Sequence, residues 1–300
     1  MTIRTPLFHS KPLIPPTHPP FAVCIATLCY TPCVPIRTIF SMVEDCSRGE
    51  RLGWHEFVRD YAGITRTLLA HYFPTLVPEM DLHLPAVFES ARGNNNSWFT
   101  ALRFANEREF MMAWREFVFI YGRSVARVPA PEISLDQMRA IMKDLPMMER
   151  ELLWLFVKGY TAPQIAAIVL NAEATATDTK RIADQRLATI LPGASPEAFN
   201  VSARVLIEAA EKVGTDKCLP WKTCNNLVNG QVTWRERELA EEHIRDCFYC
   251  LDRFTSFQEM IRLRKDAQPL PDDEIQPILA RLSLPPEKSK GLLSKLFARS

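Results

Sequence analysis

From residue 50 onwards, apolar side chains recur at steps of three and four residues, which is the period of a helix that buries one face. The first run stops at Pro74 and Pro78, because proline cannot continue a helix. Its apolar positions are Trp54, Phe57, Val58, Tyr61, Ile64, Leu68 and Leu69. No stretch of the sequence sustains the alternation of a half-buried strand, so we expect an all-α fold.

Two further apolar runs precede a proline-rich joint at residues 128–134. The run at residues 81–93 is short, and Pro85 interrupts the helix that it predicts. The run from residue 98 predicts one helix with a wide apolar stripe, formed by Trp98, Leu102, Ala105, Phe110, Trp114, Phe117 and Val118. The polar positions mostly off that stripe are Arg103, Asn106, Arg108, Glu109 and Arg115. By itself this pattern describes a helical bundle with a solvated face.

Residues 135–192 have the outline of a helix-turn-helix. Thr161 and Gln164 form the capping-box pattern that starts a helix, and Asn171 suits a left-handed corner at its end. The next helix, at about residues 174–190, should bury Ala176, Ala183, Leu187 and Ile190. Its outward residues are then Asp178, Arg181 and Gln185, with Thr175 and Arg186 at the margin. In a recognition helix such side chains contact base edges and phosphates, so we interpret these five as candidate DNA-binding residues.

The charge of this second helix is low for a DNA-binding element. Three cations and two carboxylates give it a net charge of +1, from Lys180, Arg181 and Arg186 against Asp178 and Asp184. Affinity for DNA comes largely from neutralising phosphates. A three-helix core without any DNA partner is therefore an alternative interpretation.

The most specific chemical pattern lies in the last third of the chain. Thr233 and Glu236 form a second capping-box pair, which predicts a helix over residues 234–246. On that helix His243 and Cys247 are four residues apart and project from one face, and Cys250 follows three residues later. Two thiolates and one imidazole are good zinc ligands, and a closed tetrahedral site needs one more.

Cys218 and Cys224 are the candidates for the fourth ligand. We favour Cys218, which precedes a short predicted helix, because Cys224 falls inside that helix near an expected core position. One structural Zn²⁺ held by Cys218, His243, Cys247 and Cys250 is therefore the prediction. Ordinary buried thiols are the alternative, and a redox dithiol is less favoured because His243 indicates coordination. Four protein ligands leave no position for water, so we expect no enzyme.

The composition suits a globular protein in a reducing compartment. Of 300 residues 47% are hydrophobic, and the net charge of +1 neither favours nor excludes a nucleic-acid partner. The eight cysteines form two clusters rather than a disulfide framework, which indicates a cytoplasmic location. No apolar run reaches the roughly 18 residues that a membrane span needs.

The two ends of the chain differ from the middle. Residues 1–41 hold eight prolines, three basic residues and no acidic residue. The apolar run at residues 21–30 has the length of a signal-peptide core, but prolines flank it and no cleavage site follows. We predict a disordered leader at residues 1–49, with a start at Met42 as an alternative, and a flexible tail at residues 266–300.

Three sets of residues, over about residues 50–264, resemble parts of known transcription proteins. The metal pattern resembles the zinc-binding anti-sigma domain, through Cys218, Gly230, His243, Cys247 and Cys250 in that order. The helix-turn-helix resembles region 4 of an extracytoplasmic-function sigma factor, through Leu145-Pro146, Arg150, Leu153, Gly159-Tyr160-Thr161 and Gln164-Ile165-Ala166. The helix with Asn106, Arg108 and Arg115 looks like the end of sigma region 2. The acidic polymerase-docking run of region 2 is reduced to residues 81–89, and Gln164 stands where Glu is usual, so the sigma-like part is partly degenerate.

The resemblance implies a bacterial, cytoplasmic transcription-initiation regulator. It implies a region 2-like domain at residues 50–127, a region 4-like domain at residues 135–192, a linker helix at 193–215 and a zinc domain at 216–265. Core RNA polymerase and promoter DNA would be the partners, with the zinc domain regulating the sigma-like domains. The implied DNA contacts of the first domain are Arg103, Asn106, Arg108 and Arg115. The alternative is a degenerate sigma-like interaction module that binds no promoter.

Overall fold

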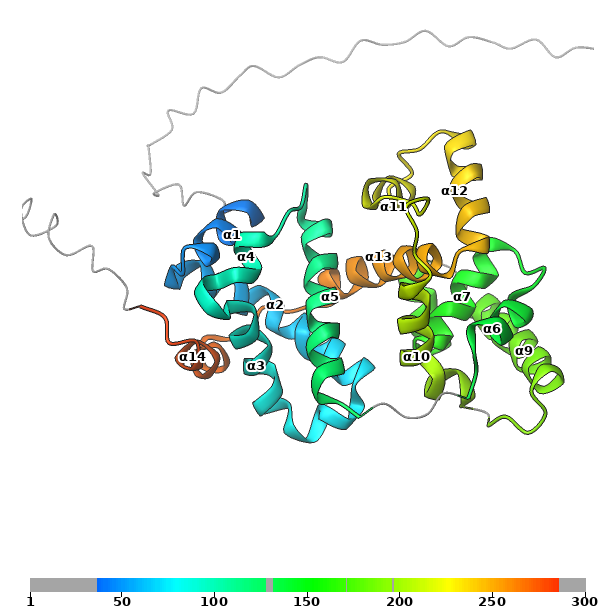
Figure 1. The fold of residues 1–300 in the computed structure, drawn as a ribbon, viewed down its shortest axis with the longest axis horizontal. Helices are drawn as coiled ribbons and strands as arrows, with labels where there is room; N and C mark the ends of the chain where they lie inside the picture. Colours follow the sequence, from blue (N-terminus) through cyan, green and yellow to red (C-terminus); the bar gives the residue numbers. More distant parts are fainter. Residues whose placement is uncertain (1–36, 128–131, 171, 196, 286–300) are drawn as a thin grey trace, which may run out of the picture. The chain divides into compact units, whose positions relative to one another are not determined.

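The computed structural model describes residues 37–127, 132–170, 172–195 and 197–285, and over these ranges it contains helices and no strand (Figure 1). The all-α prediction is confirmed. The first bundle consists of α1 (Ile39–Ser47), α2 (Arg51–Tyr72), η1 (Pro74–Glu79), α3 (Met80–Arg92), η2 (Asn94–Asn96), α4 (Ser97–Ala101) and α5 (Glu107–Val125). The second bundle consists of α6 (Leu135–Met142), α7 (Met147–Val157), α8 (Ala162–Val169), α9 (Glu173–Ile190) and α10 (Ala198–Lys212). The remaining helices are α11 (Trp221–Val228), α12 (Trp234–Asp246), α13 (Phe248–Asp266) and α14 (Asp272–Arg281).

The first bundle is built around α2, whose seven predicted apolar positions are all buried. On α2, Phe57 packs edge-on against Trp114 of α5, with ring centroids 4.7 Å apart. The indole Nε1 of Trp114 donates a hydrogen bond to Thr65 Oγ1 at 3.0 Å, so its one polar atom is satisfied inside the core. The predicted end of α2 before Pro74 is confirmed.

Four predictions in and around this bundle are wrong. Pro85 does not interrupt α3, which runs through it. The single helix predicted from residue 98 is two helices, because the Asn106 side chain caps a new helix by accepting a hydrogen bond from the Glu109 backbone N–H. Part of the predicted leader is the helix α1, which packs on α2, and part of the predicted tail is α14, which packs on α2 and α3. Residues 1–36 and 286–300 of those two segments lie outside the described residues.

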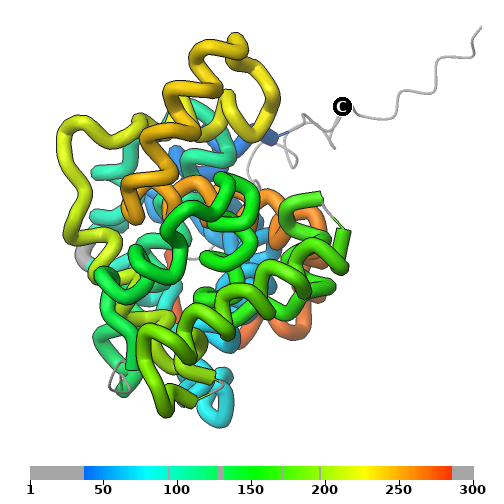
Figure 2. The backbone as a smooth tube through the Cα atoms, turned by 90° about the vertical axis from the view of Figure 1, so that its right-hand side faces the viewer, coloured from blue at the N-terminus to red at the C-terminus, as the bar shows by residue number. Residues whose placement is uncertain are grey.

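Two consecutive helices of the second bundle, α8 and α9, lie at the positions predicted for a helix-turn-helix. Thr161 and Gln164 form the capping box of α8, and α9 buries Ala176, Ala183 and Leu187 as predicted, whereas Ile190 is only half-buried. The left-handed residue at the end of α8 is Leu170, with φ of 54°, and the predicted corner at Asn171 lies outside the described residues. The predicted linker helix is α10, and it packs against α6, α7 and α13 rather than only joining two domains. Figure 2 views the chain from the side that carries α9.

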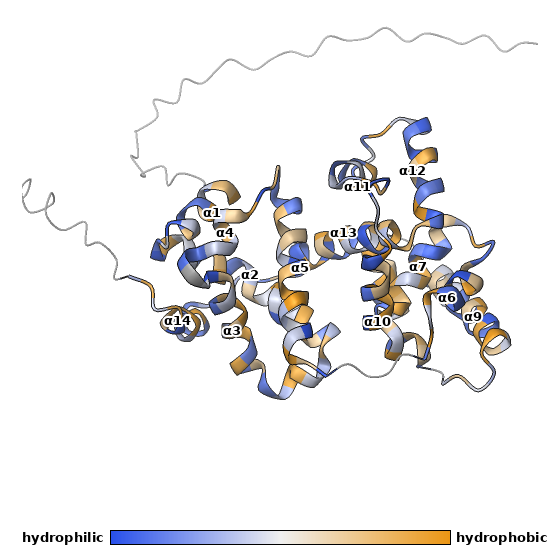
Figure 3. Cartoon of the chain, in the orientation of Figure 1, coloured by the Kyte–Doolittle hydropathy of each residue, from blue (hydrophilic) through white to orange (hydrophobic). Residues whose placement is uncertain are grey.

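α13 connects the parts of the fold. It contacts α5 of the first bundle, and α7, α8 and α10 of the second (Figure 1). The helices α11 and α12 pack on it as well, and α12 is mostly hydrophilic along its length, with Ala240 and Ile244 as its buried residues (Figure 3). α13 therefore lies where the two bundles and the α11–α12 segment meet. None of the helices in the described ranges combines the length and apolar character of a membrane span.

Candidate metal centre

Local sequence places the candidate ligands at the junction between α12 and α13. The Thr233–Glu236 capping box starts α12 at the predicted residue, which puts His243 in its last turn. Cys247 is both the C-cap of α12 and the N-cap of α13, with the extended backbone angles φ −115° and ψ 105°. Cys250 follows in the first turn of α13 and is buried. The bend at Cys247 brings the ends of the two helices to one point.

The four predicted ligand atoms come together. The sulfur atoms of Cys218, Cys247 and Cys250 and a ring nitrogen of His243 all lie within 4.8 Å of one another. The two sulfurs of Cys218 and Cys247 are 3.7 Å apart, and His243 Nε2 is 3.2 Å from the sulfur of Cys250. A tetrahedron with Zn–S bonds of about 2.3 Å has sulfur–sulfur edges of about 3.8 Å, and a nitrogen–sulfur edge is slightly shorter. The group could therefore hold one metal ion, and its spacing is compatible with zinc.

Hydrogen bonds around the group favour the thiolate, the metal-binding form of cysteine, at Cys247, whereas Cys250 keeps its proton to donate to Cys247 and its pKa is raised. The backbone N–H of Thr215 donates to the sulfur of Cys218 at 3.2 Å, and that of Leu219 donates to the sulfur of Cys250 at 3.3 Å. A hydrogen bond from the Cys250 thiol lowers the pKa of Cys247 to about 5. Such contacts orient the sulfur atoms before an ion arrives.

Cys224, the other candidate for the fourth ligand, lies elsewhere. It is fully buried on α11 among apolar residues, and burial raises the pKa of its thiol to about 11. Cys218 approaches the group from the loop before α11. Gly230 lies just after the other end of α11, where its φ is positive, at 67°. The preference for Cys218 over Cys224 thus agrees with the geometry.

The candidate DNA-binding residues of α9 lie as their spacing predicts. Asp178, Arg181 and Gln185 are exposed, and Arg181 is 3.7 Å from the carboxylate of Asp178. Thr175 and Arg186 are half-buried. The Arg186 guanidinium donates to two carbonyl oxygens at the end of α6, including that of Ile141 at 2.8 Å. Asp178, Arg181 and Gln185 therefore face solvent, whereas Arg186 holds the end of α6 through its hydrogen bonds.

The four candidate DNA-binding residues of the first bundle all interact with other parts of the chain. Arg103 is exposed and donates to backbone carbonyls of its own turn, and Asn106 caps α5. Arg108 donates to the amide oxygens of Asn225, at 3.1 Å, and Asn229, on and directly after α11. Arg115 is only 2% exposed. In this arrangement Arg108 is engaged by the segment around α11, and Arg115 has no path to a phosphate.

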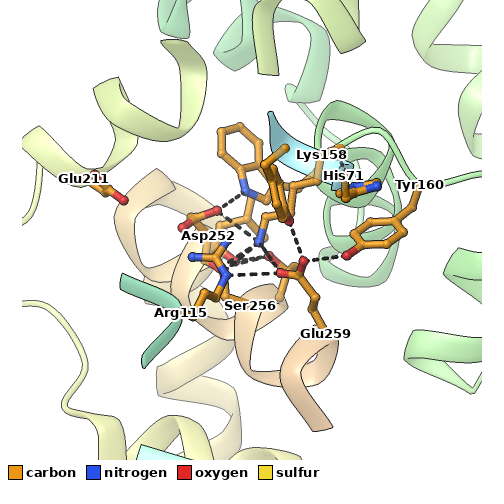
Figure 4. Close-up of polar contacts among 12 residues, drawn as sticks. His71, Arg115, Lys158, Tyr160, Glu211, Asp252, Ser256 and Glu259 are labelled. Carbon is orange, nitrogen blue, oxygen red and sulfur yellow. Dashed lines mark hydrogen bonds and ion pairs between the residues drawn. The ribbon is translucent and has the colours of Figure 1, made fainter. Parts of the chain in front are cut away.

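Arg115 belongs to a buried polar cluster that the sequence analysis missed (Figure 4). Its Nε lies 3.3 Å from Glu259 Oε2, and Lys158 Nζ lies 3.0 Å from Asp252 Oδ1. The two carboxylates belong to α13, whereas Arg115 comes from α5 and Lys158 directly follows α7. Two cations thus face two anions, and the four charges balance.

Neutral groups complete this cluster, which we call the α13 charge cluster. Tyr72 and Tyr160 donate their hydroxyls to Glu259 Oε1 at 2.6 and 2.5 Å. Lys158 Nζ also donates to Thr255 and Ser256 of α13, at 2.9 and 2.8 Å. Burial by itself would raise the pKa of Glu259, but the Arg115 and Lys158 cations outweigh it and hold that pKa below its usual value. The polar residues of α13 recur at helical steps, at positions 252, 255, 256 and 259, which was the available sequence signal.

Comparisons of the chain with protein-family models, with curated proteins and with solved structures found no match. The functional argument therefore rests on the residues and their geometry.

Proposed function

We propose that this chain is a sigma-like regulator of transcription initiation, in which a zinc-binding domain holds two sigma-like bundles in a closed arrangement. The observation that carries the proposal is the position of α13, which contacts both bundles and places two buried carboxylates between Arg115 and Lys158. The order of motifs that resembles sigma regions 2 and 4 supplies the transcriptional role. The bundles would be the parts that bind core RNA polymerase and promoter DNA.

The exposure of the candidate contacts supports a regulated protein rather than a permanently active one. On α9, Asp178, Arg181 and Gln185 face solvent, so this helix can approach DNA in the closed arrangement. In the first bundle, Arg108 and Arg115 are engaged by α11 and α13. Their use on DNA or polymerase requires that these helices move away. Release of α13 would therefore be the activating step.

Zinc is the ion that suits the Cys218, His243, Cys247 and Cys250 group. Three sulfurs and one imidazole nitrogen are soft to borderline ligands, and four protein ligands close the tetrahedron. A closed site supplies folding energy and fixes the angle between α12 and α13, and it leaves no coordination position for a substrate. The chain's own contribution is to hold the ligands in place through the N–H donors of Thr215 and Leu219.

One observation favours a second candidate function, an interaction module that binds no promoter. Helix α9 carries three cations and, with Glu173, three carboxylates, so its net charge is zero, and Lys180 is already paired with Asp184. A protein that neutralises few phosphates has little affinity for DNA, and its binding depends weakly on salt. Under this alternative, α9 would contact a protein partner.

The proposal is tested with the full chain and purified bacterial core RNA polymerase. Cys247→Ser removes one ligand and should loosen α13, so we expect tighter polymerase binding and run-off transcripts from fragmented genomic DNA. Cys224→Ala, which removes a neighbouring thiol outside the group, should behave like the wild type. If neither the wild type nor Cys247→Ser binds core polymerase, the proposed function is wrong. If polymerase binds but DNA binding shows no salt dependence, the interaction module is the better description.

A further inference from the structure

A cavity between the helices is lined by none of the residues of the α13 charge cluster and by none of the candidate metal ligands. It has a volume of about 430 Å³, within the usual range for small-molecule sites. Its walls come from α5, α7, α8, α11, α12 and α13, so elements of both bundles and of the metal-binding segment meet around it. Much of the lining is apolar, including Ile168, Leu227, Phe254 and Ile261.

Two half-buried polar side chains of this cavity, Glu151 and Gln258, have few partners. The carboxylate of Glu151 accepts one hydrogen bond, from Gln258 Nε2 at 3.1 Å, and no cation of the described residues lies within ion-pair distance of it. Because the Gln258 amide turns its nitrogen to Glu151, its oxygen is left buried and without a donor. Burial raises the pKa of Glu151 to about 7, as expected for a carboxyl group with no counter-charge.

The two arginines that line the cavity have partners of their own. Arg237 pairs with Glu241 one turn further along α12, at 3.3 Å. Arg108 donates to the amide oxygens of Asn225 and Asn229. Neither arginine therefore neutralises Glu151, and a ligand in this cavity could give it a hydrogen-bond donor and a positive charge beside an apolar wall.

We propose that this cavity binds an organic cation, namely an amine with an apolar body. The ammonium group would donate to the Glu151 carboxylate, and the body would contact Ile168, Leu227 and Phe254. A charge-assisted hydrogen bond between an ammonium and a carboxylate is about twice as strong as a neutral one. Water could also fill the space, but it brings no charge to a half-buried carboxyl group and gains nothing from the apolar wall.

Such a ligand would reinforce the closed arrangement. Glu151 belongs to α7 and Gln258 to α13, and the opposite wall comes from α11 and α12. A molecule that contacts all of them binds only while they stay together, and it stabilises that state in proportion to its occupancy. This regulatory consequence rests on the proposed function, whereas the binding site itself does not.

The test is isothermal titration calorimetry on the full chain at pH 8 with three probes of similar size. 2-Phenylethylamine should bind, whereas the neutral 2-phenylethanol and the anionic 3-phenylpropionate should bind at least about 10-fold more weakly, since one charged hydrogen bond separates them. Glu151→Gln keeps the shape of the side chain and removes its charge, so we expect at least about 10-fold weaker amine binding. Glu116→Gln is the control for the loss of one carboxylate, because Glu116 is exposed and its side chain lies outside this cavity.

Three results would overturn the site. The absence of any heat of binding at millimolar amine would show that the cavity does not bind it. Equal binding to Glu151→Gln would show that the amine binds elsewhere. Preference for the anionic probe would reverse the assigned charge. The outcome is independent of the transcription assay: amine binding that depends on Glu151 keeps the site even if core polymerase does not bind, and polymerase binding survives a failed titration.

Discussion

Glu259 offers the most direct measurement of what α13 contributes to the fold. Its side chain is 0% exposed and interacts with Tyr72, Tyr160 and Arg115, from three other segments of the chain. Glu259→Ala removes the acceptor of two buried hydroxyls and the nearest anion of a buried guanidinium. The variant also leaves Asp252 as the one carboxylate of the α13 charge cluster facing two cations.

The magnitude follows from these contacts. Breaking a buried ion pair by removing one partner costs about 3–5 kcal/mol, and each buried hydroxyl that loses its acceptor costs about 1–3 kcal/mol. Because these contributions share one side chain and are not additive, we expect Glu259→Ala to lower the free energy of unfolding by about 4 kcal/mol. Asp266→Ala on the same helix removes an exposed pair with Arg262 and should cost about 0.5 kcal/mol or less.

Urea unfolding of the full chain, followed by far-UV circular dichroism, compares the two variants at pH 7. A third variant, Arg115→Met with Glu259→Leu, removes one cation and one anion together and leaves the Lys158–Asp252 pair balanced. It should recover about 2 kcal/mol relative to Glu259→Ala, since it strands no charge. A loss below about 1 kcal/mol for Glu259→Ala would refute the reasoning, because a fully buried and paired carboxylate cannot be that dispensable.

Three further predictions concern metal and pH. Chelation with EDTA, or Cys247→Ser, should lower the melting temperature by several degrees, which differential scanning calorimetry detects, whereas Cys224→Ala should not abolish the response to EDTA. Burial lowers the pKa of His71, so the folded state resists its protonation, and stability should fall as the pH drops below about 6.5; His71→Gln should flatten this part of the urea-midpoint profile. The raised pKa of Glu151 has the opposite sign, because stability is lost as the pH rises from about 4.5 through 7; Glu151→Gln should therefore gain about 2 kcal/mol at pH 8 and nothing at pH 4.5.

Local signals were sufficient for the helices that begin with a strong cap. The pairs Thr161–Gln164 and Thr233–Glu236 predicted the starts of α8 and α12, and both capping boxes form. Such contacts span three residues, so no tertiary information is needed to predict them. The same signal was present and overlooked at Asn106, where Glu109 follows three residues later and a new helix begins.

The helix α14 needed tertiary information. α14 is short, follows Pro271 and contains Pro277, so its sequence indicates a linker. It becomes helical against α2 and α3, where Ile275 and Leu279 are buried. α3 tolerates Pro85 for a related reason, since that proline packs in the core and the helix loses one backbone hydrogen bond there.

The candidate metal ligands could be predicted from local spacing, whereas the α13 charge cluster depends on long-range contacts. Helical spacing predicted that His243, Cys247 and Cys250 converge, because one turn of helix and one bend suffice. The cluster around Glu259 could not be predicted, because its partner Tyr72 lies 187 residues away in sequence. Spacing on α13 indicates only that polar groups share a face, and the long-range fold decides what they meet.

α13 links the candidate metal ligands to the buried charges through one helix, which bears on how the proposed closed arrangement would open. Cys250 lies in its first turn, and Glu259 follows nine residues later, about 13 Å along the axis at 1.5 Å per residue. A change at the Cys247 bend therefore moves Asp252 and Glu259 as one body against Arg115 and Lys158. Charges hold the helix in one register, because any shift strands a buried ion. They also ease its departure, since carboxylates that leave the interface regain the hydration that burial removed. An apolar helix of the same length would bind the bundles more tightly and would be harder to release. A charged α13 therefore suits the proposed role, in which the helix holds the two bundles together and is then released.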